Sequence, residues 1–113
     1  MLIYKLLSHA EWREALAAGV FAGSAADRAD GFIHFSTAAQ LAQTARKHFR
    51  GRSDLMLFAV SADALGDTLR WEASRGGDLF PHLYDALACS LIVTSRRAPL
   101  AADGEHDLGT LTE

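Results

Sequence analysis

The chain has 113 residues, half of them hydrophobic, and a net charge of −3 with its histidines neutral. A chain of this length normally forms one domain, so we expect a single domain over residues 1–113. The charge argues against a broad nucleic-acid surface, and no apolar window approaches the ~18 residues of a membrane span.

The N-terminal residues have no basic region followed by a long apolar run, so we expect no secretory signal and a cytoplasmic protein. The single cysteine, Cys89, lies in an apolar stretch and excludes an intrachain disulfide. We expect it to be a small buried side chain rather than a nucleophile.

The first thirty residues predict a strand, a helix and a loop. Leu2–Leu7 is an apolar run typical of a strand. Ser8 and Glu11 form a capping-box pattern, and the helix that follows is expected to end at Gly19, a residue favoured after helices. Residues 22–30 show no periodicity and are expected to form a loop.

A second strand and helix follow. Gly31–Phe35 is short, aromatic and branched, as strands are. Thr37 and Gln40 repeat the capping pattern, and the amphipathic helix after them is expected to stop at Gly51.

The second half of the chain is richer in strands. Leu55–Val60 predicts a central strand covered on both faces. Leu69–Glu72 and Leu91–Ser95 predict two more strands, and residues 74–78 a flexible loop. The tail over residues 99–113 is expected to be extended or mobile. Because helices and strands mix without strict alternation, we expect an α+β fold, with a bent sheet flanked by two helices, rather than a doubly wound parallel sheet.

Alternation along the strand near residue 34 predicts one apolar and one polar face. Ile33 and Phe35 share one face, and His34 and Ser36 the other. The polar face ends at a helix N-terminus, where free amides attract anions. Two alternatives stay open: Thr37 merely caps the helix, and His34 is a structural histidine.

Glu72 lies at a strand end next to Trp71, and a carboxylate beside an apolar wall has its pKa raised and can act as a base. The alternative is a surface carboxylate paired with Arg70 or Arg75.

In the segment after Pro81, His82 and Tyr84 point the same way if the chain is extended, so imidazole and phenol can orient one ligand. The alternative is simple packing at a sheet edge.

No other pattern predicts a site. The histidines have no metal-ligand spacing, and no phosphate-loop or dinucleotide fingerprint is present. A basic patch at helical spacing is expected to be a solvated face rather than a phosphate site. It consists of Arg46, Lys47, Arg50 and Arg52.

Several of these segments occur together in one order along residues 3–84. They are Ile3-Tyr4-Lys5, Asp30-Gly31-Phe32-Ile33-His34-Phe35-Ser36-Thr37 with Gln40, Leu69-Arg70-Trp71-Glu72, and Phe80-Pro81-His82-Leu83-Tyr84. This combination resembles a bacterial family, the domain-of-unknown-function family 952 (DUF952).

The resemblance implies a fold similar to the ADP-ribosyltransferases: a split, strongly bent, mainly antiparallel sheet with a cleft that holds NAD in active relatives. It implies a small-molecule ligand, with NAD as the cofactor and ADP-ribosyl transfer or NAD glycohydrolysis as the activity. It assigns catalysis to Glu72 and His34. It assigns cofactor binding to Lys5, Ser36, Thr37, His82 and Tyr84.

Lys5 stands where active members of that superfamily carry His or Arg, and lysine is a point charge rather than a planar fork. This difference favours the alternative of a non-catalytic small-molecule-binding or sensor module. The sequence leaves open whether the chain forms a homo-oligomer.

Overall fold

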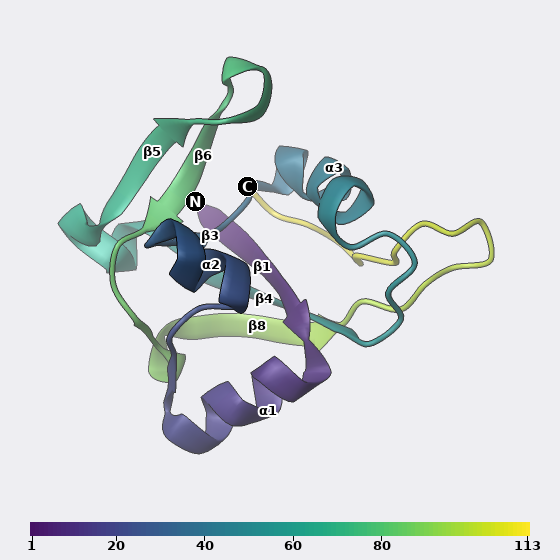
Figure 1. Cartoon of the computed structure of the whole chain (residues 1–113), viewed down its shortest axis with the longest axis horizontal. Helices are drawn as coiled ribbons and strands as arrows, with labels where there is room; N and C mark the ends of the chain where they lie inside the picture. Colours follow the sequence, from purple (N-terminus) through teal and green to yellow (C-terminus); the bar gives the residue numbers. More distant parts are fainter.

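Antiparallel strands form the frame of the molecule (Figure 1). The computed structural model describes residues 1–113, apart from the side chain of Arg75. One sheet has the order β1-β4-β8 and a second the order β3-β6-β5, while β2 and β7 pair separately. The strands are β1 Leu2–Ser8, β2 Val20–Phe21, β3 Ile33–His34, β4 Leu55–Ser61, β5 Leu69–Ala73, β6 Leu79–Leu83, β7 Leu87–Ala88 and β8 Ile92–Arg97.

An isolated bridge joins the two larger sheets. Tyr4 of β1 pairs with Ser36, and their backbone hydrogen bonds are 2.8 and 2.9 Å long. The backbone N–H of Phe35 also donates to Pro81 of β6. The chain is therefore α+β and antiparallel, as the sequence predicts, and its sheet is divided at this bridge.

The α-helices all begin at capping boxes. They are α1 His9–Ala18, α2 Ala25–Asp30 and α3 Ala38–His48. Ser8 and Thr37 cap α1 and α3 as predicted, and Gly19 ends α1 in the left-handed conformation. The helix α3 ends two residues earlier than expected, with Phe49 as its C-cap. Short 3-10 turns lie at η1 Ala62–Thr68, η2 Arg75–Gly77 and η3 Cys89–Leu91.

The prediction of a loop over residues 22–30 is wrong, because residues 25–30 form α2. Ser24 and Asp27 make both hydrogen bonds of a capping box, and Gly31 closes the helix with φ of 87°. A six-residue helix is too short to show the hydrophobic period on which the prediction relied. Its buried residue is Asp27, a charged side chain.

The central strand β4 has a hydrophobic core on each side, as predicted. Met56, Phe58 and Val60 belong to the core under α1. Leu55 and Leu57 belong to the core under α3. Alternation along β4 produces this division, because successive side chains point to opposite faces.

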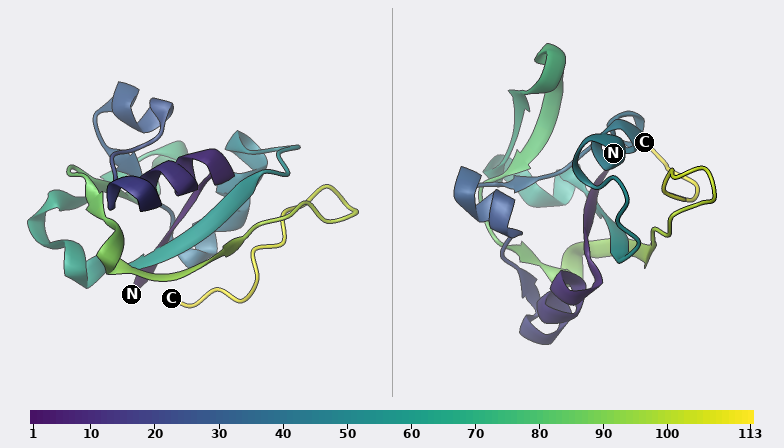
Figure 2. Two further views of the ribbon diagram at one scale, coloured as in Figure 1. Left: turned by 90° about the horizontal axis from the view of Figure 1, so that it is seen from below. Right: turned by 45° about the vertical axis from the view of Figure 1, so that its right-hand side comes forward.

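The C-terminal tail is irregular but packed against the domain. Leu108 and Leu111 contact the core under α3. The Tyr4 hydroxyl donates to the Thr112 carbonyl at 2.8 Å and accepts from the Thr112 N–H at 2.7 Å. The two termini therefore lie close together (Figure 2). Among the described helices, none has the length and apolar character needed to cross a membrane.

Candidate functional site

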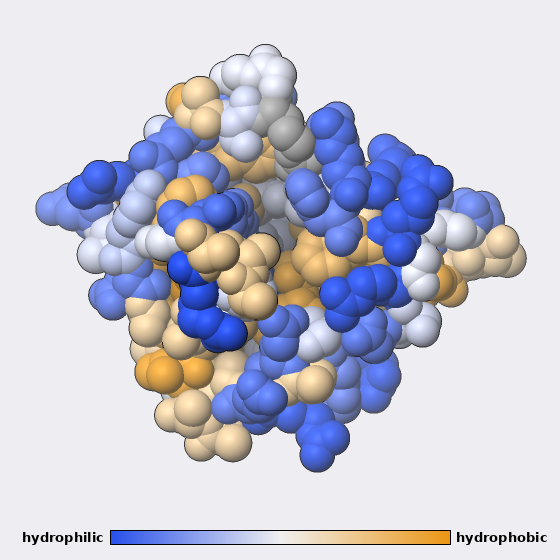
Figure 3. Space-filling model, viewed as in Figure 1, coloured by the Kyte–Doolittle hydropathy of each residue, from blue (hydrophilic) through white to orange (hydrophobic). Residues whose placement is uncertain are grey.

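A cleft of about 480 Å³ opens between β1, α2, β3, α3 and β6. This size is within the range of small-molecule sites. Figure 3 shows the face hollowed at its centre, with hydrophobic residues inside the hollow and hydrophilic residues along much of its rim. The polar lining includes Lys5, Asp27, Asp30, His34, Ser36, Thr44, His48 and His82.

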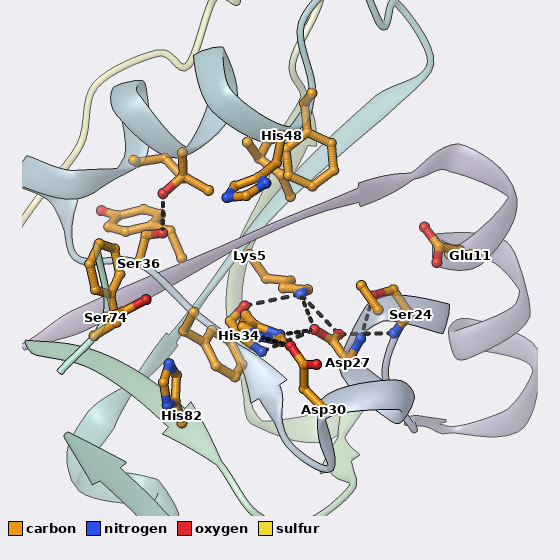
Figure 4. Close-up of a pocket in the computed structure, with 18 of the residues that line it drawn as sticks. Lys5, Glu11, Ser24, Asp27, Asp30, His34, Ser36, His48, Ser74 and His82 are labelled. Atoms are coloured by element: carbon orange, nitrogen blue, oxygen red, sulfur yellow. Dashed lines mark hydrogen bonds and ion pairs between the residues drawn. The ribbon is translucent and has the colours of Figure 1, made fainter. Parts of the chain in front are cut away.

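Asp27 is the centre of the buried charge network (Figure 4). Its side chain is 2% exposed. The Lys5 ammonium lies 3.0 Å from one carboxylate oxygen and 2.9 Å from the other. His34 donates its backbone N–H to Oδ1 at 3.1 Å and holds its ring Nδ1 2.6 Å from the same oxygen. The Ser24 backbone N–H donates to Oδ2, so the capping box that begins α2 also aims Asp27 at the cleft.

The charges in this network shift one another's pKa. Burial alone would raise the pKa of Asp27, but the hydrogen bond from His34 and the charge of Lys5 outweigh it and hold the pKa well below its usual range. Burial lowers the pKa of Lys5, and its interaction with Asp27 opposes this only in part. Lys5 and Asp27 therefore depend on each other for their charged forms.

A second polar group lies on the hairpin of β5 and β6. His82 Nδ1 is 2.8 Å from Glu72 Oε1, and the Tyr84 hydroxyl donates to the same oxygen at 2.6 Å. The hydrogen bond from Tyr84, followed by that from His82, lowers the pKa of Glu72. In turn, Glu72 raises the pKa of Tyr84.

The expectation of a raised pKa at Glu72 is wrong. Trp71 points to the opposite face of the hairpin, is 39% exposed, and offers Glu72 no apolar wall. The alternative of an ion pair between Glu72 and Arg70 is also not observed, because Glu72 contacts His82 and Tyr84. Arg70 instead lies over the Tyr84 ring at 4.9 Å. Arg75, the other expected partner, has a side chain outside the described part of the chain.

Phe32 joins the two polar groups. Its ring is stacked on His82 with centroids 4.1 Å apart, and it lies 4.6 Å from His34 and 5.2 Å from Tyr84. The strands β3 and β6 pair in the register that sets His34 opposite His82, with ring centroids 5.6 Å apart. Residues 32–34 and 82–84, which are far apart in the sequence, therefore meet at one place.

Four of the seven predicted site residues line the cleft, and three do not. Lys5, His34, Ser36 and His82 line the cleft. Glu72 supports His82 from the hairpin. The other two are placed as follows: the Thr37 hydroxyl accepts the Gln40 N–H as the N-cap of α3, and Tyr84 lines a neighbouring hollow of about 320 Å³.

The prediction missed Asp27, Asp30 and Phe32. Asp27 carried a usable signal, because Ser24-Ala25-Ala26-Asp27 has the spacing of a capping box. The sequence identifies Phe32 only as a strand residue, because its ring contacts depend on strand pairing that no local pattern reveals.

The remaining expectations concern the surface. The basic patch is exposed, and its Arg46 and Arg52 pair with Glu105 and Asp54. Arg46, Lys47 and Arg50 fit the expected solvated face, whereas Arg52 also lines the cleft. Cys89 is half-buried and donates to the Ala15 carbonyl, and burial raises the pKa of its thiol. Within the described residues, no three His, Cys, Asp or Glu side chains are arranged to hold a metal ion.

Comparison with known proteins identifies the family. The family model described as "Protein of unknown function (DUF952)" matches residues 6–95. The crystal structure of protein CC0527 from Caulobacter crescentus is 54% identical with a TM-score of 0.92, and the match covers 96% of this chain and 95% of that one. The crystal structure of a double mutant of CC0527 is 53% identical with a TM-score of 0.92 over the same shares. The solution NMR structure of CC0527 is 55% identical with a TM-score of 0.86, over 96% of this chain and 93% of that one. No curated protein matches. The chain belongs to the DUF952 family.

Proposed function

We propose that this protein binds a small polar molecule in the cleft, and that the molecule is a nucleotide, with NAD as the first candidate. The observation that carries the proposal is the convergence of Lys5, Asp27, His34 and His82, from four different elements, on one cleft. Buried charged groups contribute little net stability compared with apolar side chains. Their concentration in a cleft is therefore characteristic of a binding or catalytic site.

The chemical make-up of the cleft suits a nucleotide. Leu6, Leu41 and Phe80 provide apolar surface for a planar ring, and the polar side chains provide donors and acceptors for sugar and phosphate oxygens. The resemblance to ADP-ribosyltransferases supports NAD ahead of other nucleotides.

The same resemblance supports ADP-ribosyl transfer or NAD glycohydrolysis as the reaction. Loss of nicotinamide leaves positive charge on the ribose, which an ionised carboxylate stabilises. Glu72 has a lowered pKa, so it is ionised at neutral pH. His82 and Tyr84 hold the carboxylate in one orientation.

A second candidate is a binding module without chemistry. The observation that favours it is the engagement of Lys5, whose ammonium contacts both oxygens of Asp27 and the His34 carbonyl. A lysine held in this way is not available to anchor a cofactor by direct contact.

The test is a titration with NAD and ADP-ribose, followed by amide chemical shifts and melting temperature, with nicotinamide release measured in parallel. Binding with release supports the enzyme, and binding without release supports the module. Absence of any change at millimolar NAD and ADP-ribose would contradict the nucleotide proposal.

The variant Glu72→Gln tests the role of the carboxylate. We expect it to abolish nicotinamide release while binding is kept, because the amide lacks the charge that stabilises the ribose. Glu14→Gln, at an exposed position on α1, is the matched control. Equal release by both variants would remove the catalytic role of Glu72.

A further inference from the structure

His82 has a buried ring nitrogen that the fold does not use. The residue is 6% exposed and lines the cleft. Its Nδ1 is taken by Glu72 at 2.8 Å. Its Nε2 has no hydrogen-bond partner within the part of the chain that the structure describes. Because a buried polar atom without a partner is destabilising, this nitrogen points to a ligand group as its partner.

The contact at Nδ1 determines which kind of group can pair with His82 Nε2. A carboxylate oxygen only accepts hydrogen bonds, so Glu72 fixes the proton of a neutral His82 on Nδ1. The Nε2 of that neutral ring is an acceptor. A hydroxyl of a ligand is therefore its natural partner.

His34 is held differently at its two nitrogens. Its Nδ1 lies 2.6 Å from the buried Asp27, whereas its Nε2 lies 2.9 Å from Asp30. Asp30 is the last residue of α2 and is 57% exposed. Exposed ion pairs contribute little to stability and exchange partners readily, so Asp27 fixes the ring while Asp30 is a replaceable partner.

Both nitrogens of His34 face carboxylate oxygens, so the ring satisfies both contacts only when it is protonated and donates from each nitrogen. A protonated imidazole that loses one carboxylate partner can donate the same N–H to another oxyanion in its place. Asp30 thus marks the position of an anionic ligand group.

We propose that His34 and His82 together recognise a sugar phosphate, with the phosphate bound at His34 Nε2 in competition with Asp30, and a sugar hydroxyl bound at His82 Nε2. The ring centroids are 5.6 Å apart, a separation that a phosphate and a hydroxyl of one ligand can span. This inference rests on the proposed nucleotide binding and names the part of the nucleotide that the two histidines hold.

The test uses ribose 5-phosphate as the probe, with ribose and inorganic phosphate for comparison. Imidazole ¹⁵N signals follow His34 and His82, and NAD is titrated separately. We expect ribose 5-phosphate to shift the Nε2 signals of both rings and to bind more tightly than ribose or phosphate.

Two variants test the contributions of Asp30 and His82 separately, and a third controls for the change in net charge. Asp30→Asn is expected to tighten ribose 5-phosphate binding by about two- to fivefold, because an exposed ion pair no longer competes. Asp63→Asn, at an exposed position in η1, removes the same charge away from the cleft and controls for net charge. His82→Phe keeps the ring that stacks on Phe32 and is expected to weaken binding about tenfold through the lost hydrogen bond.

The outcomes distinguish this inference from the proposed function. NAD binding that leaves both Nε2 signals unmoved would overturn the histidine pair while the nucleotide proposal stands. Ribose 5-phosphate binding as described, without NAD binding, would support the pair and reject NAD. An Asp30→Asn variant that binds no more tightly than Asp63→Asn would overturn the competition by Asp30, and this readout does not depend on whether His82→Phe folds.

Discussion

Asp27→Asn is expected to be one of the most destabilising conservative substitutions in this chain. Both carboxylate oxygens of Asp27 accept only from N–H donors: Oδ1 from Lys5 and twice from His34, and Oδ2 from Lys5 and from the Ser24 backbone. An asparagine side chain replaces one of these oxygens with an NH₂ group. Whichever way the amide is turned, a donor then faces at least two donors.

The size of the expected stability loss follows from the burial of the Lys5–Asp27 ion pair. Lys5 is 6% exposed, and without the Asp27 charge its ammonium has only neutral acceptors, the His34 carbonyl at 3.0 Å and the new amide oxygen. Breaking a buried ion pair by removing one partner costs about 3–5 kcal/mol. A domain of this size is stable by only about 5–15 kcal/mol in total. At about 4 °C per kcal/mol, the melting temperature should fall by roughly 12–20 °C.

Urea unfolding and thermal melting at pH 7 measure this loss. Asp54→Asn is the matched control, because Asp54 pairs with Arg52 on the surface, where both side chains are at least 43% exposed, and it should cost less than about 1 kcal/mol. Adding Lys5→Met to Asp27→Asn should recover part of the stability, since no unpaired charge then remains buried. A free energy of unfolding for Asp27→Asn within about 1 kcal/mol of the parent protein would refute the reasoning.

Three further predictions concern stability. Because the folded pKa of Asp27 is lowered, its stabilising contribution is complete above about pH 4 and is lost as pH falls toward the folded value; urea midpoints from pH 5 to 2 should therefore fall more steeply in the parent than in Asp27→Asn. Gly23→Ala should cost at least about 1 kcal/mol more than Gly19→Ala, because both glycines have positive φ but only at Gly23 would the new Cβ lie 2.9 Å from Asp27 Cβ; equal losses in urea unfolding would contradict this. Leu111→Ala should cost about 1 kcal/mol, because Leu111 packs on the core under α3; an unchanged urea midpoint would show that the tail adds nothing to the stability of the fold.

The sequence predicted the elements whose signals are local. The boxes at Ser8 and Thr37 depend on residues three positions apart, and both helices begin where these boxes place them. The alternation that buries Ile33 and Phe35 is equally local. The helix α2 was missed because its six residues carry no apolar stripe, and β2 and β7 are only two residues each.

The candidate site depends on contacts that are not local. No local pattern in the sequence reveals the register of β3 on β6, which brings His34 opposite His82. The prediction for Glu72 is wrong because its environment also depends on strand pairing. Its neighbour along the chain, Trp71, points away, and the groups that set its pKa come from across the hairpin.

The charge network at Asp27 links the stability of the fold to the shape of the cleft. Apolar residues of similar volume would stabilise the same position as well or better, so stability alone does not explain a buried carboxylate there. What the carboxylate adds is a fixed orientation of Lys5 and His34 at the wall of the cleft. Loss of binding in Asp27→Asn would therefore mix unfolding with misplaced ligand contacts. Asp30 lines the cleft at an exposed position and Glu72 lies on the hairpin beside His82, so a substitution at either residue leaves the buried Lys5–Asp27 pair intact.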